Sequence, residues 1–260
     1  MQTLFTNFTT FYFIEVSTYA RIAQLVEHST DTRAVPSSNL GSRTKYMNVF
    51  ENFNFAQVKG VLLDFDNTLY AYKPCHEKAL RRLYDEYSTI IEALSYEDFL
   101  LRYKEAQDAV KEKTNGQAAS HSRFLYVQHM LECAIKKTDV QKTLLLEETY
   151  WSSFMEEMKL QEGVIEFLAE CKKRGVMVCL ITDLTAAVQF RKIQRLGLDS
   201  LIDYVVTSEE AGAEKPEPLI FSCALKKLGL LPKDVVMIGD DSKKDIDGAR
   251  NYNITAFQVI

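Results

Sequence analysis

Apolar and polar residues follow two different patterns along this chain. From residue 58 to 73, and again from 160 to 260, short apolar runs bounded by glycine or aspartate alternate with stretches of helical period. From 74 to 159 the period is helical throughout, without a strand-like run. Alternating strands and helices are typical of a parallel sheet with helices on both faces. We therefore predict an α/β fold, a doubly wound parallel sheet into which an all-helical segment is inserted after the first strand.

The same change of pattern sets the expected domain boundaries. Residues 47–73 and 160–260 are expected to form the core domain, and residues 74–159 an inserted helical cap domain. Five apolar runs of the core predict strands, and they fall at 61–65, 176–181, 204–206, 235–238 and 254–259. Core helices are expected at 164–173, 186–196 and 218–228.

Four helices are expected in the cap. Pro74 fits the first position of one helix, because that position needs no backbone N–H donor. Ser95 fits the N-cap of the next helix, with Asp98 three residues later. The last two helices are expected at 122–136 and 140–158.

The first 46 residues differ from the rest of the chain. They begin with a crowd of Phe, Thr and Asn but have no basic segment and no clear cleavage site, so a signal peptide is not expected. Residues 21–41, RIAQLVEHSTDTRAVPSSNLG, resemble a peptide that recurs in conceptual translations across transfer-RNA genes. We therefore expect residues 1–46 to be a non-native or disordered extension, with Met47 as the better start.

Composition narrows the class of protein. The 260 residues carry a net charge of −5 and no block of Lys or Arg, which argues against nucleic-acid binding through a basic face. The five cysteines form no C-x-x-C pair, so free thiols in a reducing cytoplasm are expected. No apolar run approaches the roughly 20 residues that span a bilayer, so no membrane contact is expected. The oligomeric state stays open.

Polar residues follow several of the predicted strands at the point where each strand ends. In a parallel sheet these ends lie on one edge, where ligands of open α/β sheets bind. The residues concerned are Asp64, Asp66, Thr182, Asp183, Asp240 and Asp241, with Lys215 in a loop after the 204–206 strand. The sequence therefore predicts one site that holds several carboxylates, a hydroxyl and an ammonium group.

Helix capping is the alternative interpretation for some of these acids. Asp183, Asp241 and Ser242 could each cap a following helix. Asp64 is different, because it interrupts an apolar strand, and a buried carboxylate is costly unless it is paired or metal-bound. Two like charges 4 Å apart repel by roughly 4 kcal/mol at an effective dielectric constant of 20. Clustered carboxylates without His or Cys therefore indicate a cation, with Mg²⁺ favoured over zinc.

Four segments occur in order along the chain: DFDNTL at 64–69, LITD at 180–183, EKPEP at 214–218 and GDDSKKD at 239–245. Together they resemble the four motifs of the haloacid dehalogenase superfamily of hydrolases, and the resemblance covers residues 58–260. The helical insertion after the first motif resembles the helical cap of that family. The resemblance implies a Rossmann-like core, dependence on Mg²⁺ and an aspartyl-phosphate intermediate.

The resemblance also implies roles for the residues that handle the phosphate. Asp64 would be the nucleophile, and Asp66 would protonate the leaving group and then activate water. Thr68 would support the loop and hydrogen-bond Asp66. Thr182 and the backbone amide of Asp183 would hold phosphate oxygens.

A second group of residues would handle charge and metal, again by resemblance. Lys215 would neutralise charge on the nucleophile and on the phosphoryl group. The metal ligands would be Asp64, the backbone carbonyl of Asp66, Asp240 and, directly or through water, Asp241. Asp245 would orient Lys215 or a metal-bound water.

Asp66 indicates which reaction of the superfamily to expect. An acid two residues after the nucleophile suits hydrolysis of a phosphate ester, whereas the dehalogenases of this family lack it. We therefore expect a phosphatase that acts on a small soluble phosphate ester, either a sugar phosphate or a nucleotide. A sugar phosphomutase keeps both acids and stays an alternative, although Thr68 favours a phosphatase. A catalytically silent binding or regulatory protein on the same fold is the second alternative.

Substrate specificity is expected to come from the cap. Tyr70 is a candidate for the pocket wall, and His121 and Arg123 are candidates for contacts with a second anionic group. The alternative for His121 and Arg123 is that they are solvated residues at a helix start. His76 is expected to be a first-turn helix residue.

Overall fold

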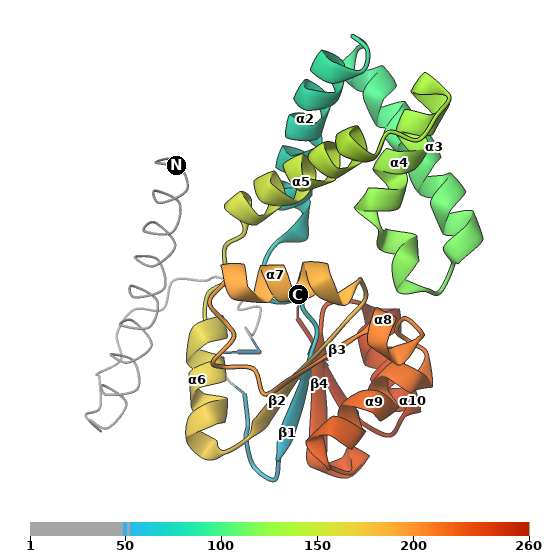
Figure 1. Cartoon of the computed structure of the whole chain (residues 1–260). Coiled ribbons are helices and arrows are strands. Elements are labelled where there is room, and N and C mark those ends of the chain that lie inside the picture. Colours follow the sequence, from blue (N-terminus) through green and yellow to red (C-terminus); the bar gives the residue numbers. More distant parts are fainter. Residues whose placement is uncertain (1–48, 51–52, 260) are drawn as a thin grey trace, which may run out of the picture.

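One parallel sheet of five strands forms the centre of the protein (Figure 1). The computed structural model describes residues 49–50 and 53–259, so the prediction about residues 1–46 lies outside the described residues. The strand order is β3-β2-β1-β4-β5, and all four pairings are parallel. The strands are β1 Gly60–Leu63, β2 Met177–Thr182, β3 Tyr204–Thr207, β4 Val235–Gly239 and β5 Thr255–Gln258. All five predicted strands are confirmed, within two residues at each end.

The two faces of the sheet pack against different helices. Leu62 belongs to the apolar cluster that includes α9 (Pro218–Leu228), whereas its neighbour Leu63 belongs to the cluster that includes α6 (Val164–Arg174). This division follows from the alternation of side chains along a strand. Burial on both faces explains why the central strands are continuously apolar, and it confirms the doubly wound α/β architecture.

A group of helices lies beyond the carboxyl edge of the sheet (Figure 1). Its members are α2 Tyr72–Ile90, α3 Tyr96–Thr114, the short turn η1 Ala118–His121, α4 Arg123–Ile135 and α5 Val140–Glu157. Helix α2 begins two residues before Pro74, so the prediction that Pro74 starts the helix is wrong. The Asn67 side chain accepts a hydrogen bond from Tyr72 N at 3.1 Å, which gives that otherwise unpaired donor a partner. Pro74 still lies in the first turn, where its missing N–H costs nothing.

Two chain crossings join this helical group to the sheet, and they are hydrogen-bonded to one another. Gln161 on the return crossing donates its backbone N–H to the Leu69 carbonyl at 2.8 Å, and its side chain donates to the Asn67 carbonyl at 3.2 Å. Tyr70 forms a β-bridge with Leu160. The loop after β1 is therefore fixed to the crossing that leads back into the core.

Short helical segments were not predicted from the sequence. They are α8 Ser208–Ala211, η2 Pro232–Asp234, the wide turn η3 Ser242–Asp247 and α10 Gly248–Asn251. Segments of three to six residues are too short to show a helical period. The longer core helices α6, α7 (Ala186–Arg195) and α9 lie where they were expected. Among the described residues, no helix is long and apolar enough to cross a membrane.

Ser95 is an N-cap as predicted, because its side chain accepts a hydrogen bond from Asp98 N at 3.1 Å. We expect Ser95→Ala to lower the free energy of unfolding by about 1 kcal/mol, since this N–H loses its acceptor. Urea denaturation followed by circular dichroism measures the change. Ser152→Ala, at an exposed position inside α5, is the matched control and should change stability little. Equal stabilities for the two variants would contradict the capping role.

Candidate active site

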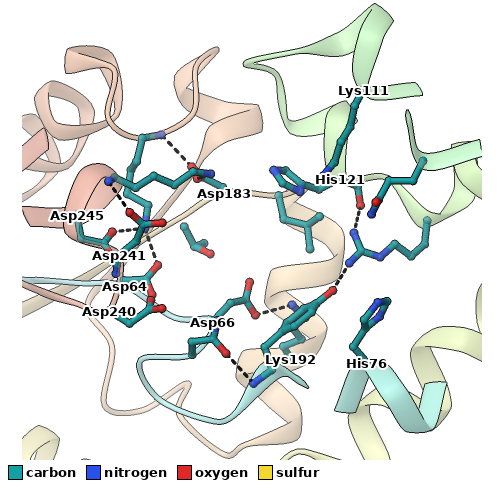
Figure 2. A pocket seen from close by; sticks show the side chains of 18 of the residues that line it. Asp64, Asp66, His76, Lys111, His121, Asp183, Lys192, Asp240, Asp241 and Asp245 are labelled. Carbon is teal, nitrogen blue, oxygen red and sulfur yellow. Dashed lines mark hydrogen bonds and ion pairs between the residues drawn. The ribbon is translucent and has the colours of Figure 1, made fainter. Parts of the chain in front are cut away.

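Three aspartates meet at the carboxyl edge of the central strands. Asp64 directly follows β1 and Asp240 directly follows β4, while Asp245 lies in η3. One carboxylate oxygen from each lies within 4.8 Å of the others (Figure 2). Asp64 N also donates to the Ile238 carbonyl at 2.9 Å, so the β1–β4 pairing continues up to the aspartate and fixes its position.

Lys215 lies inside this cluster and is only 4% exposed. Its ammonium group donates to Asp64 Oδ1 at 2.5 Å, to Asp245 Oδ1 at 2.7 Å and to the Ile181 carbonyl at 3.2 Å. Although burial opposes the charged form, the negative charges of Asp64 and Asp245 raise the pKa of Lys215 well above its ordinary value. Lys215 is therefore a permanent cation in contact with two carboxylates.

One ammonium does not neutralise three carboxylates. Burial raises the pKa of Asp64 to about 6, and the charge of Asp245 adds to the effect against that of Lys215. Burial and then the charge of Asp64 raise the pKa of Asp240 to about 6. Burial likewise raises the pKa of Asp245. An all-oxygen cluster with surplus negative charge has the donor chemistry of a site for a hard divalent cation.

Asp66, two residues after Asp64, has a separate set of donors. Lys192 Nζ donates to Asp66 Oδ1 at 2.8 Å, Gln189 Nε2 donates to Oδ2 at 3.0 Å, and the Tyr70 hydroxyl donates to Oδ1. Burial alone would raise the pKa of Asp66, but the Lys192 charge and these hydrogen bonds lower it below its ordinary value. Asp64 and Asp66 therefore have opposite pKa shifts, although only one residue separates them.

Sequence reasoning missed Lys192 and Gln189, which both lie on the buried face of α7. Lys192 is fully buried and its ammonium lies 5.2 Å from the Trp151 ring centroid and 5.1 Å from that of Phe154. Burial lowers the pKa of Lys192, whereas Asp66 opposes the shift. The sequence did hold one signal for them, their position in the helix. Gln189 and Lys192 lie on the same buried face of α7 as Val188 and Ile193.

Two expectations about the loop after β1 are wrong. Thr68 does not hydrogen-bond Asp66; its hydroxyl donates to Asp64 Oδ2 at 2.7 Å and lies 3.3 Å from Asp240 Oδ1. The reason is that the loop turns the Thr68 side chain towards the nearby ends of β1 and β4. Tyr70 does not line the cavity, because its ring is fully buried and its hydroxyl is bound to Asp66.

Asp183, which follows β2, and Asp241, which follows β4, have different hydrogen-bond partners. Asp183 accepts from Lys215 N at 2.9 Å and from Lys244 Nζ at 2.7 Å. Asp241 accepts from the backbone N–H groups of Lys243 and Lys244 at 2.8 and 2.9 Å, so it caps η3. The side chain of Asp241 therefore matches the capping alternative rather than the expectation of a metal ligand. Thr182 is buried, lines the cavity and is hydrogen-bonded to Gln189.

A cavity of about 360 Å³ joins this cluster to the helical group. His121 and Arg123 both line it, and so does His76, which was expected in the first turn of a helix at the site entrance. The alternative that Arg123 is a solvated helix-start residue is wrong, because it is buried. His76 Nδ1 lies 2.6 Å from the Tyr150 hydroxyl, and burial followed by the charge of Arg123 lowers the pKa of His76 to about 4. Lys111 and Gln107 also line the cavity and were not predicted.

The family of the protein follows from sequence comparison. Residues 58–253 match the haloacid dehalogenase-like hydrolases, so the chain belongs to this family. It is 38% identical over 189 residues to a ribulose-1,5-bisphosphate 5-phosphatase of Halopiger xanaduensis, covering 73% of this chain and 79% of that protein. It is 30% identical over 207 residues to a glyceraldehyde 3-phosphate phosphatase of Methanopyrus kandleri, covering 78% and 84% of the two chains.

Solved structures agree on the fold. A 2-haloacid dehalogenase from Pseudomonas syringae pv. tomato superposes with a TM-score of 0.62 at 22% sequence identity, covering 77% of this chain and 86% of that one. The similarity supports the core fold and the inserted helices, and it carries no information about the reaction.

Gly239 lets Asp245 approach the end of β4. A Cβ added at Gly239 would lie 2.3 Å from Asp245 Oδ2 and 2.4 Å from its Cγ, so Asp245 would have to leave Lys215. We expect Gly239→Ala to lower the free energy of unfolding by about 3 kcal/mol, because a buried ion pair is broken. Urea denaturation checks the value. Gly116→Ala is the control, since its added Cβ meets nothing within 4 Å and only its positive φ costs about 1 kcal/mol. Equal losses in both variants would refute the prediction.

Proposed function

We propose that this protein is a Mg²⁺-dependent phosphatase that hydrolyses small phosphate monoesters through an aspartyl phosphate on Asp64. The observation that carries the proposal is that two neighbouring carboxylates in one cavity have different contacts and opposite pKa shifts. Asp64 contacts Lys215 at the sheet edge, while Asp66 contacts Lys192 and Gln189. A pair of acids in different environments is what a nucleophile and an acid/base group require. Family membership and the phosphatase activities of the two relatives support the same reading.

The reaction divides into two displacements. Asp64 attacks phosphorus, and the bond from phosphorus to the ester oxygen breaks while Asp66, which must enter this step protonated, donates its proton to that oxygen. Water then attacks the aspartyl phosphate and gives a proton to Asp66. Inorganic phosphate leaves and the Asp64 carboxylate is restored, so that one water is consumed for each ester. Lys215 stabilises Asp64 and offers positive charge to the phosphoryl oxygens, with Thr182 and the Asp183 amide as further contacts.

Asp64 and Asp240 are the proposed side-chain ligands of Mg²⁺, together with the Asp66 backbone carbonyl. Their raised pKa values and all-oxygen chemistry support this assignment. Asp245 belongs to the same cluster, but its contact with Lys215 supports a role in positioning that lysine. Asp241 is left out of the set because its side chain caps η3. Bound Mg²⁺ would supply positive charge to the phosphoryl group.

Residues 74–159 are proposed as a cap domain over a core of residues 47–73 and 160–260. The cavity between the helical group and the sheet edge supports this division. The substrate is proposed to be a small sugar phosphate, in line with the phosphatase activities of the two relatives, and a nucleotide is the alternative. Five free cysteines among the described residues support a reducing compartment such as the cytoplasm.

The proposal is tested by screening phosphate monoesters with Mg²⁺ and with EDTA. We expect Mg²⁺-dependent release of phosphate, and we expect Asp64→Asn to reduce it by at least about a thousandfold, because the nucleophile is lost. Asp85→Asn, at an exposed acid of α2 away from the cavity, is the control and should keep full activity. Wild type and Asp64→Asn that are equally inert across the panel would favour the silent binding protein. Transfer of phosphate to a sugar hydroxyl instead of water would favour the phosphomutase.

Lys192 should set the pH dependence of the reaction through Asp66. It lowers the pKa of Asp66, so Lys192→Met should raise that pKa. Whichever limb of the kcat–pH profile Asp66 controls should therefore move to higher pH. Arg195→Met, at an exposed cation on the same helix, should leave the profile in place. An unchanged profile in Lys192→Met, with folding verified by circular dichroism, would exclude this role.

A further inference from the structure

The cavity above the sheet edge has two walls of opposite charge. Its floor carries six aspartates from the core: Asp64, Asp66, Asp183, Asp240, Asp241 and Asp245. The helical group contributes seven other residues to the lining: Tyr72, His76, Gln107, Lys111, His121, Arg123 and Trp151. None of these seven is acidic, and two of them, Lys111 and Arg123, are basic, whereas the core side sets three lysines against its six aspartates. In Figure 2 the labelled Lys111 and His121 lie across the cavity from Asp64 and Asp240.

Arg123 differs from the other buried cations among the described residues. Lys215 contacts Asp64 and Asp245, and Lys192 contacts Asp66. Arg123 is only 7% exposed, yet within the described part of the chain no carboxylate is ion-paired with it. Its guanidinium group donates to neutral acceptors, the His121 carbonyl at 2.6 Å, the Tyr150 hydroxyl at 3.4 Å and the Tyr72 hydroxyl. A buried charge is costly unless a partner compensates it.

Aromatic rings around Arg123 orient the guanidinium but do not neutralise it. Its central carbon lies 5.5 to 6.0 Å from the ring centroids of Tyr72, Tyr126, Tyr150 and Trp151. Such rings attract a cation through their quadrupole and carry no net charge. The guanidinium is thus held rigidly at the cavity wall with its positive charge unmatched.

Neighbouring groups on the same wall add positive charge. Burial lowers the pKa of Lys111, and the charges of Arg123 and Lys104 lower it further, against the charges of Asp108 and Glu214. The carboxylate of Glu214 is 3.1 Å from His121 Nε2 and 3.9 Å from Lys244 Nζ. The carboxylate of Glu214 is therefore in contact with His121 and Lys244, and Glu214 does not line the cavity.

We propose that Arg123 and Lys111 bind a second phosphate group on the substrate, so that the protein acts on small bisphosphorylated molecules. This inference rests on the proposed phosphatase function and names its substrate class. One phosphate occupies the floor beside Asp64, and the other compensates Arg123 on the opposite wall. Both walls line one cavity of about 360 Å³, near the lower end of the range for ligand sites, which suits a short carbon chain between the two phosphates.

A nucleoside monophosphate fits this wall less well. Its base could stack on Trp151 or Tyr72, but a neutral base would leave Arg123 without a counter-ion. A planar guanidinium binds a phosphate through two parallel hydrogen bonds, and Lys111 adds a point charge. The charge pattern of the wall therefore favours a doubly charged group over an aromatic one.

The experiment compares matched pairs of substrates with Mg²⁺. Ribulose 1,5-bisphosphate is tested against ribulose 5-phosphate, and fructose 1,6-bisphosphate against fructose 6-phosphate. We expect wild type to favour at least one bisphosphate by tenfold or more in kcat/KM. Lys111→Met and Arg123→Lys should each remove most of that preference, because they raise KM for the bisphosphate more than KM for the monophosphate. Lys113→Met is the matched control, because this exposed lysine lies on the same helix outside the cavity, and it should keep the preference.

Binding to Asp64→Asn, measured by calorimetry, tests the inference even without turnover. This variant should bind the bisphosphate at least tenfold more tightly than the monophosphate, and adding Lys111→Met should abolish the difference. Equal affinity and equal kcat/KM within every pair would overturn the inference, while hydrolysis of monophosphates alone would still support the proposed function. A preference for 3-phosphoglycerate over every bisphosphate would overturn it too, because the second group would then be a carboxylate. Wild type that hydrolyses no ester would refute the phosphatase instead.

Discussion

The ion cluster in which Lys215 contacts both Asp64 and Asp245 is the interaction on which the rest of this site depends. It ties the end of β1, the loop before α9 and the turn η3 to a single ammonium group. Gly239 is required because Asp245 passes where a side chain on β4 would stand. Asp64 is thereby held in one orientation, and Asp240 and Thr68 are placed beside it. The surplus of negative charge that remains gives the site the donor chemistry for the proposed divalent cation.

Charge also divides the cavity as a whole. The core side carries six aspartates against three lysines, Lys192, Lys215 and Lys244, whereas the lining residues of the helical group include no acid. The proposed ligand is anionic at both ends and would bind the proposed metal ion at one end, so its charges would be compensated on both sides of the cavity. The same division explains why the pKa of Asp66 is lowered beside Lys192, while Asp64 and Asp240, buried among other carboxylates, have raised pKa values.

Sequence patterns predicted the sheet and the acids at its edge well, because both depend on local periodicity. A continuously apolar strand followed by an aspartate is visible in β1 and β4 without any structure. The contacts of Lys192 and Arg123 were not predictable in this way, since their partners Asp66 and Tyr72 are distant from them in the sequence. The same limit applies to the expected roles of Thr68, Tyr70 and Asp241, because the sequence does not show in which direction a short loop turns a side chain.

The loop that follows Asp64 is also the joint between the two halves of the molecule. Asn67 and Leu69 accept hydrogen bonds from Gln161 on the returning crossing, and Asn67 also receives the first N–H of α2. Asp66 thus lies on a segment that is hydrogen-bonded both to the returning crossing and to the start of α2. Under the proposed mechanism, a ligand that displaced these helices would also displace the residue that handles the proton. Mutations that change binding of the distal end of a substrate would then also change the rate of turnover.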